Sequence, residues 1–326
     1  MPICTTCTHS TEYLYTTYES EYNLRLEQCS NCKAFVDPYV EFDALTLFID
    51  LILLKPGVYR HLLYNRGTEP RKLGQGEQKE QEKAAKQESS KYDAKEQRRW
   101  LLIAKLGPSL VFLDAFIRWS YLNPTSSSDP IIWTADMLKA FGRILAGTVA
   151  ETLAFHLGIM FVSYCLLKLV DWLQTWRTQS RTPSAVRQEF RLSLIPLTLF
   201  YSSLTKYFLL LLLTIWLPAS SSKPPPTSQP LPSWVDKVLP NNELAYWAFQ
   251  LLDDDKLDRE WLVRNVLGGM SAGFGLRVIL DDIQPIFTTS IIVLGWGAKT
   301  LVANFVSGWI GGDQTFQEAW LAYSIP

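Results

Sequence analysis

Four cysteines near the amino terminus form two CxxC pairs, Cys4 with Cys7 and Cys29 with Cys32. Each pair lets two thiolates converge from one tight turn, and a tetrahedral zinc ion with four sulfur ligands needs two such turns face to face. Because all four ligands would be cysteine, no position remains for a catalytic water, so the zinc would be structural. Two disulfides, or a redox or iron–sulfur role, are alternatives that the spacing favours less.

The residues between the two pairs predict a β-hairpin. Residues 13–18 and 23–28 are rich in aromatic, β-branched and alternating side chains, and a polar turn at residues 19–21 separates them. Residues 1–40 are therefore predicted to form a zinc ribbon. A module this short has little core of its own, so metal binding would supply its folding free energy.

Two further motifs follow the ribbon, V-D-P-Y-V-E-F-D at residues 36–43 and K-P-G-V-Y-R-H-L-L-Y-N at residues 55–65. With the cysteine pairs they resemble the Arv homology domain, closely over residues 4–65 and more loosely through to about residue 310. That resemblance implies an endoplasmic reticulum membrane protein, not an enzyme, that acts in lipid homeostasis. It further implies roles in intracellular sterol distribution, glycosylphosphatidylinositol-anchor synthesis and sphingolipid metabolism. The implied partners are membrane lipids, sterol foremost, and glycosylphosphatidylinositol-assembly or other membrane proteins of that compartment.

Composition agrees with a membrane protein. The chain has 326 residues, 48% of them hydrophobic, and a formal net charge of -1, which gives no bulk positive charge for binding nucleic acid. Residues 1–35 are polar and contain the cysteines, so no cleavable signal peptide is expected there. Insertion would then depend on internal spans, and the predicted fold class is mainly α, a multi-span helical membrane protein with a small β zinc ribbon.

Residues 41–65 are predicted to form an amphipathic helix in the membrane interface that completes the homology domain. The apolar run is too short to cross a bilayer, and its polar positions 43, 46 and 50 share one helix face. Its end carries the aromatic, cationic and amide side chains predicted to meet lipid headgroups or a partner: Tyr59, Arg60, His61, Tyr64 and Asn65. The alternative is an ordinary amphipathic helix packed on a soluble domain.

A charged segment, residues 66–99, separates this domain from the rest of the chain. It has almost no apolar side chains, so we expect a flexible linker, although pairs such as Glu82 and Lys86 would support a solvated helix. Residues 100–326 are predicted to form the helical membrane domain. Its predicted spans lie near residues 101–122, 141–169, 190–217, 262–280 and 286–310, with a Pro/Ser-rich loop at 218–233. The 262–280 segment can either span or re-enter.

Ionisable side chains inside predicted spans are the remaining candidate site residues, because such groups are rare in lipid and often functional. They are Asp114, Arg118, Glu151, His156 and Lys206. Asp114 and Arg118 are four residues apart and can pair on one helix face. Glu151 and His156 are five apart, about 140° around a helix, so they cannot face one ligand unaided. Two interpretations of these residues stay open: a structural polar contact between helices, and binding of a lipid headgroup or an ion.

Small residues recur every fourth position in the same span, at Gly142, Ala146, Ala150, Ala154 and Gly158, and they predict close approach of another helix. Along the chain, basic loops alternate with loops that carry few basic residues or an excess of acidic ones. Arginines are concentrated in residues 171–191 and acidic residues in 218–261. This pattern places the amino terminus and the 171–191 loop in the cytosol. A reducing compartment in turn favours zinc over disulfides.

Two other functional classes stay open on the sequence. The ribbon could recruit a cytosolic or membrane partner while the spans only anchor it, as in an adaptor. A lipid-modifying enzyme would have to use Asp114, Glu151, His156 or Lys206, and no nucleophile and base lie at a useful spacing among them.

Overall fold

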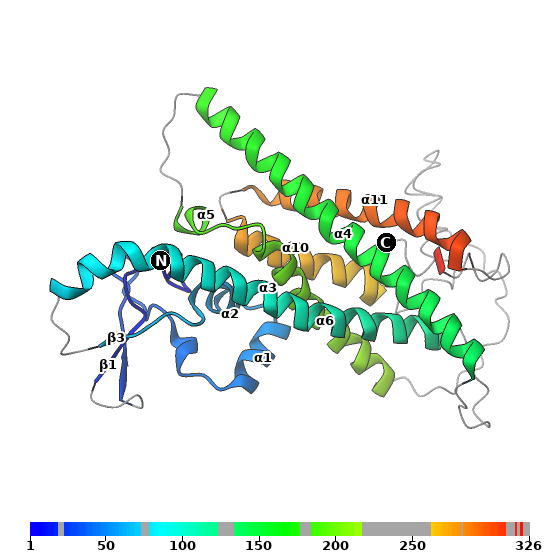
Figure 1. Ribbon diagram of the computed structural model, residues 1–326, viewed down its shortest axis with the longest axis horizontal. Coiled ribbons are helices and arrows are strands. Elements are labelled where there is room, and N and C mark those ends of the chain that lie inside the picture. Colours follow the sequence, from blue (N-terminus) through cyan, green and yellow to red (C-terminus); the bar gives the residue numbers. More distant parts are fainter. Residues whose placement is uncertain are drawn as a thin grey trace, which may run out of the picture.

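The computed structural model describes residues 1–18, 23–72, 78–122, 134–176, 184–216, 262–281, 283–310, 317 and 320–321. Long helices make up most of the described residues, and the small sheet lies at one end beside the amino terminus (Figure 1). The predicted class, a mainly helical membrane protein with a small amino-terminal β module, is confirmed. The Pro/Ser-rich loop at 218–233 and the acidic stretch at 234–261 lie outside the described residues.

The predicted hairpin is present as two short antiparallel strands, β1 (Tyr15–Thr17) and β2 (Leu24–Leu26). Thr16 lies opposite Arg25, which fixes the register. A third strand, β3 (Arg71–Lys72), pairs in parallel with β1, giving the order β2-β1-β3. The segment that was expected to begin the flexible linker therefore returns to the ribbon.

Residues 41–65 form several short elements rather than one helix. They follow the 3-10 turn η1 (Pro38–Val40) and comprise α1 (Ala44–Ile52), α2 (Pro56–Arg60) and the π-helical segment η2 (His61–Asn65). α1 and α2 are separated because Leu54 has a left-handed φ of 55° and a proline begins α2. The segment predicted as an amphipathic helix is therefore divided into two α-helices and a π-helical segment.

α1 presents apolar side chains on its outer side. Leu45, Phe48, Ile49 and Leu53 are exposed, whereas the end of the helix packs on α6 (Leu194–Trp216). The Thr205 hydroxyl of α6 donates to the Ile52 carbonyl over 3.0 Å. A contiguous exposed apolar stripe on one helix is what contact with lipid or another protein requires.

The charged segment is not a flexible spacer, because α3 runs without a break over Gln78–Leu122. Helix propagates cheaply from an existing span, and i, i+4 pairs of opposite charge support it. Lys95 donates to the Tyr64 carbonyl over 3.3 Å, and Arg99 donates to the Leu63 carbonyl over 3.0 Å. The start of the first span is thus fastened to the end of the homology domain.

Within the described residues, four helices are long and apolar enough to cross a membrane. They cover Ala94–Ser120 in α3, Ala135–Leu173 in α4 (Ala135–Trp176), Leu194–Leu213 in α6 and Pro285–Ile310, which is α11. The 262–280 segment is not among them. It forms the π-helical segment η3 (Leu262–Leu267), which continues directly into α10 (Gly268–Ile279). α10 packs instead against α6 and α11.

The helix α4 packs most extensively on α11 (Figure 1). The small residues of α4 were predicted to allow close approach of another helix. Gly158 does so, since a Cβ there would lie 3.0 Å from the Ala298 Cβ, whereas a Cβ at Gly142 would have nothing within 4 Å. The buried face of α4 is displaced by one or two positions and includes Ile144, Thr148 and Glu151. A four-residue repeat drifts around a 3.6-residue helix, so it cannot stay on one face over five positions.

Gly295 on α11 offers a test of this packing. A Cβ there would lie 2.6 Å from Ile159 Cγ1, and Gly297 has nothing within 4 Å. We expect Gly295→Ala to destabilise the protein by about 1–3 kcal/mol through overpacking. Gly297→Ala, two residues away, is expected to be neutral or to stabilise by up to about 1 kcal/mol. Thermal unfolding of both variants in detergent measures the difference, and equal midpoints would contradict the packing of α4 on α11.

Candidate functional site

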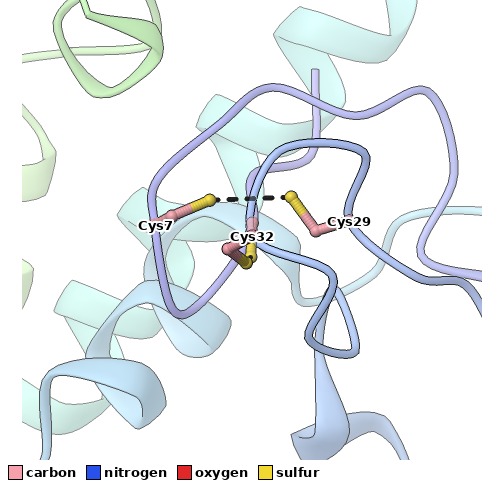
Figure 2. A group of neighbouring side chains, drawn as sticks. Cys7, Cys29 and Cys32 are labelled. Carbon is pink, nitrogen blue, oxygen red and sulfur yellow. Dashed lines mark hydrogen bonds between the residues drawn. The ribbon is translucent and has the colours of Figure 1, made fainter.

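The four cysteines come together as one cluster. Figure 2 shows three of them, Cys7, Cys29 and Cys32, on two facing turns. The Sγ atoms of Cys4 and Cys32 are 3.7 Å apart, those of Cys7 and Cys29 are 3.6 Å apart, and all four lie within 4.8 Å of one another. Four sulfurs at about 2.3 Å from a tetrahedral zinc ion are about 3.8 Å from each other. The thiols are not joined as disulfides, and the donor set fits a metal ion.

The two turns have the same geometry. The backbone N–H of Thr8 donates to the Cys4 carbonyl over 3.0 Å, and that of Lys33 donates to the Cys29 carbonyl over 3.0 Å. Both donors stand four residues after the first cysteine of their pair and have left-handed φ values, 63° and 62°. Burial raises the pKa of the Cys4 thiol to about 12, so this side chain needs a bound cation to carry the thiolate charge.

A buried hydrogen-bond network ties the ribbon to the 55–65 motif. The Asp37 carboxylate, fully buried, contacts His61 Nδ1 at 2.8 Å and accepts from Asn65 Nδ2 at 2.8 Å. Asn65 also accepts from the Ile3 N–H at 2.9 Å and donates to the Ile3 carbonyl at 2.8 Å. Because Ile3 precedes Cys4, this network positions the first metal-binding turn.

Arg60 fastens the same turn from outside. Its Nη1 donates to the carbonyls of Thr5 and Thr6, which lie between the first two cysteines, at 2.9 and 3.1 Å. Its Nη2 lies 4.0 Å from the Asp281 carboxylate, just after α10. Tyr59 packs edge-on against Phe274 of α10, with ring centroids 6.0 Å apart. The 55–65 motif therefore joins the metal centre to the helical bundle.

This placement corrects the predicted role of the motif as a headgroup-facing surface. Tyr59, His61, Tyr64 and Asn65 are all buried, at 0, 8, 2 and 1% exposure. Burial raises the pKa of both phenols, which stay neutral. Aromatic and cationic side chains occur at membrane interfaces and also in buried hydrogen-bonded contacts, so their types alone do not distinguish the two.

We expect Asn65→Ala to destabilise the protein by about 2–3 kcal/mol, because the Ile3 N–H, the Ile3 carbonyl and the Asp37 carboxylate each lose a buried partner. The measurement is chemical unfolding of the purified chain, with metal content measured in parallel. The control is Asn23→Ala, an exposed asparagine next to β2, which should leave the midpoint unchanged. A silent Asn65→Ala would show that the network does not hold the turn.

A second cluster of charged side chains lies inside the bundle. The predicted pair is present, with Arg118 Nε 3.3 Å from Asp114 Oδ2, and Arg118 Nη1 also lies 2.8 Å from Glu151 Oε2 on α4. Asp114 Oδ1 is 2.7 Å from Arg264 of η3 and 3.8 Å from Lys206 of α6. Four of the five predicted intramembrane residues therefore meet at one place, brought there by α3, α4 and α6.

A cavity of about 110 Å³ adjoins this cluster. His156, the fifth predicted residue, lines it and lies beside Phe200 with ring centroids 4.6 Å apart. As predicted from their spacing, Glu151 and His156 have different surroundings. The sequence analysis missed three polar lining residues, Lys299, Arg264 and Asn265. A lone lysine in the final span was the available signal for Lys299, whereas η3 gave no comparable one.

Comparisons with known proteins found a family profile and several curated relatives that match this chain. A profile described as "Arv1-like family" matches residues 3–224. "Protein ARV1" of Eremothecium gossypii is 54% identical over 63 residues, which is 19% of this chain and 21% of that protein. "Protein arv1" of Schizosaccharomyces pombe is 49% identical over 63 residues, 19% and 24% of the two chains. "Protein ARV 2" of Arabidopsis thaliana is 50% identical over 62 residues, 19% and 27%.

The matched segment spans about a fifth to a quarter of the length of these curated relatives. No solved structure matches this chain. The family profile, by contrast, extends from the metal-binding turns through the first three membrane-spanning helices. The chain belongs to the Arv1-like family.

Proposed function

We propose that this protein acts in lipid homeostasis at the endoplasmic reticulum membrane, where it promotes intracellular sterol distribution and supports glycosylphosphatidylinositol-anchor and sphingolipid metabolism. The observation that carries the proposal is the family match over residues 3–224, together with what the Arv homology domain implies. The outward apolar stripe of α1 supports contact with membrane lipid. The proposed partners are sterol and other membrane lipids, with proteins of glycosylphosphatidylinositol assembly as further candidates.

The role is proposed to be non-enzymatic. The metal centre has a closed set of four sulfur donors, which leaves no position for substrate or water. Asp114 and Glu151 in the bundle each contact an arginine, so both carboxylates are engaged in ion pairs. These arrangements favour structural roles over general acid or base catalysis.

The proposed metal is one zinc ion, bound by Cys4, Cys7, Cys29 and Cys32. The near-tetrahedral spacing of four thiols supports zinc over hard cations, which prefer oxygen ligands. Elemental analysis of the purified chain tests the assignment. One zinc per chain is expected, and stoichiometric iron with visible absorbance would replace it with an iron centre.

The experiment for the function is complementation in a Saccharomyces cerevisiae strain that lacks its own "Protein ARV1". Expression of this chain should restore the normal distribution of sterol between internal and plasma membranes. Residues 1–72 on an unrelated membrane anchor form the second arm. Rescue by that fusion would favour an adaptor whose spans only anchor it, and lipid turnover by the purified chain would favour an enzyme.

The ribbon is proposed to face the cytosol. In the structure, the backbone carbonyls of Leu63 and Tyr64 contact the start of the first span, and the amino terminus contacts Glu189 within the 171–191 loop. These contacts support a position of the ribbon and the basic loop on the same side of the membrane. The positive charge of the loop supports the cytosolic side.

Site-directed thiol labelling tests that orientation. In a Cys165→Ser background, an impermeant reagent added to intact microsomes should label Ser180→Cys and leave Ser228→Cys unlabelled until detergent is added. Removal of Cys165 is needed because this thiol is exposed outside the metal cluster. The reverse labelling pattern would invert the topology and place the cysteine cluster in an oxidising compartment.

A further inference from the structure

The cavity beside the intramembrane charge cluster lies deep in the bundle. Lys206 and Lys299 both line it, and each is at least seven residues from either end of its membrane-spanning segment. At 1.5 Å per residue, both lie about 10 Å or more inside those spans. Helices α3, α4, α6, α10 and α11 all contribute lining residues. Ionisable groups at such depth are costly unless they are compensated.

Positive charge exceeds negative charge at this place. Among the described residues of the cluster and cavity, the cations are Arg118, Lys206, Arg264 and Lys299, and the carboxylates are Asp114 and Glu151. Both carboxylates are engaged by arginine. Lys299 has no carboxylate within 4.0 Å in the part of the chain that the structure describes. Among the described residues, the formal excess of two positive charges in a low-dielectric surrounding favours a bound anion.

A buried hydrogen-bond donor in the cavity also indicates a ligand. Asn265 is 4% exposed and lines the cavity, and its Nδ2 has no hydrogen-bond partner among the described residues. A buried amide N–H without an acceptor is destabilising, so an acceptor in the cavity would stabilise the fold.

The cavity size restricts what can bind. A volume of about 110 Å³ is well below the roughly 300–1,000 Å³ of pockets that bury drug-sized ligands. A rigid four-ring sterol is such a ligand, whereas a phosphate group is far smaller. Phosphate oxygens accept several hydrogen bonds at once and pair with both guanidinium and ammonium groups.

We infer that this cavity is a binding site for a phosphate group, recognised by Lys299, Lys206, Arg264 and the Asn265 amide. Phosphate groups reach such a site either as the headgroups of phospholipids or as free inorganic phosphate. This phosphate site is separate from the proposed role in sterol distribution, because the cavity is too small for a sterol. Phosphate binding can be measured on the purified chain alone.

The test uses the purified full chain in neutral detergent with three separate probes: dioctanoyl phosphatidate, dioctanoylglycerol and sodium phosphate. Native mass spectrometry gives the bound stoichiometry, and thermal unfolding gives the stabilisation. We expect one phosphatidate per chain and no retained dioctanoylglycerol. Stabilisation by sodium phosphate at constant ionic strength would assign free phosphate as a ligand, and stabilisation by phosphatidate alone would assign a lipid headgroup.

Three substitutions locate the site. Lys299→Met is expected to weaken phosphatidate binding at least about tenfold, as loss of a charged hydrogen bond predicts. Lys299→Arg should retain binding within about threefold because it keeps the charge. Lys105→Met is the matched control, because Lys105 is an exposed lysine of the first span that does not line the cavity.

Asn265→Asp is a second variant, chosen because it is nearly isosteric and lowers the excess positive charge. It should fold and lose phosphatidate binding, since a carboxylate replaces the amide donor and repels the anion. Equal retention of dioctanoylglycerol and phosphatidate by the wild type would overturn the inference. Unchanged binding by both Lys299→Met and Asn265→Asp would do the same.

Discussion

Replacing Cys29 with serine is expected to abolish stoichiometric metal binding and to unfold residues 1–40. Cys29 is 1% exposed and its Sγ lies 3.6 Å from that of Cys7, so the thiolate is an inward-facing ligand. Structural zinc supplies on the order of 10 kcal/mol in small zinc modules, and the hydrophobic cluster around these cysteines contains few side chains. Elemental analysis and hydrogen exchange of residues 1–40 give the two readouts.

The matched control is Cys165→Ser, which makes the same chemical change at an exposed cysteine of α4 and should retain one metal ion per chain. Chelation of the wild-type protein should reproduce the exchange pattern of Cys29→Ser, and added zinc should reverse it. The helical bundle should stay inserted in every case, because its spans bury their backbone polar groups without the ribbon. A full complement of metal in Cys29→Ser would refute the four-cysteine centre.

The four-cysteine cluster was predictable because its information is local. Two CxxC pairs define two turns, and their chemistry requires the turns to meet, whatever the rest of the chain does. The Asp114–Arg118 pair was predictable for a similar reason, since four residues separate neighbours on one helix face. Spacing within one element or one metal site can be read directly from sequence.

Contacts between distant elements could not be read in this way. Arg264 meets Asp114 across 150 residues, and Asn65 meets Ile3 across 62. The types of these residues allow exposed and buried roles equally, and only the fold distinguishes them. The 66–99 segment shows the related limit for polar sequences, since a charged composition is compatible with a solvated helix that continues a membrane span.

The 55–65 motif shows both a local feature that the sequence predicts and distant contacts that it does not. Its aromatic and cationic side chains suggested a segment at the membrane interface, and α2 begins at its proline. The side chains, however, hold the metal-binding turn against α10 through Arg60, Asn65 and Tyr59. Loss of activity in variants of this motif would therefore follow from loss of that attachment, and metal content and stability must be measured beside any lipid assay.

The charge cluster in the bundle gives the second large expected effect. Arg118 lies between two carboxylates, 3.3 Å from Asp114 and 2.8 Å from Glu151, and its guanidinium also stacks over the Trp320 ring at 4.9 Å. Arg118→Met is expected to destabilise the bundle by about 3–5 kcal/mol, because it removes the cation between two buried negative charges. Arg143→Met is the control, because Arg143 is exposed on α4 and should show little change.

A double substitution separates lost charge pairing from lost packing. If the cost of Arg118→Met comes from the carboxylate that it leaves beside α4, then adding Glu151→Met should recover at least half of the lost stability, because a well-packed apolar pair can replace a buried ion pair. Unfolding of the wild type, both single variants and the double variant in one detergent closes the cycle. Additive losses would mean that Arg118 and Glu151 are not coupled, and that Arg118 acts mainly through Asp114 and Trp320.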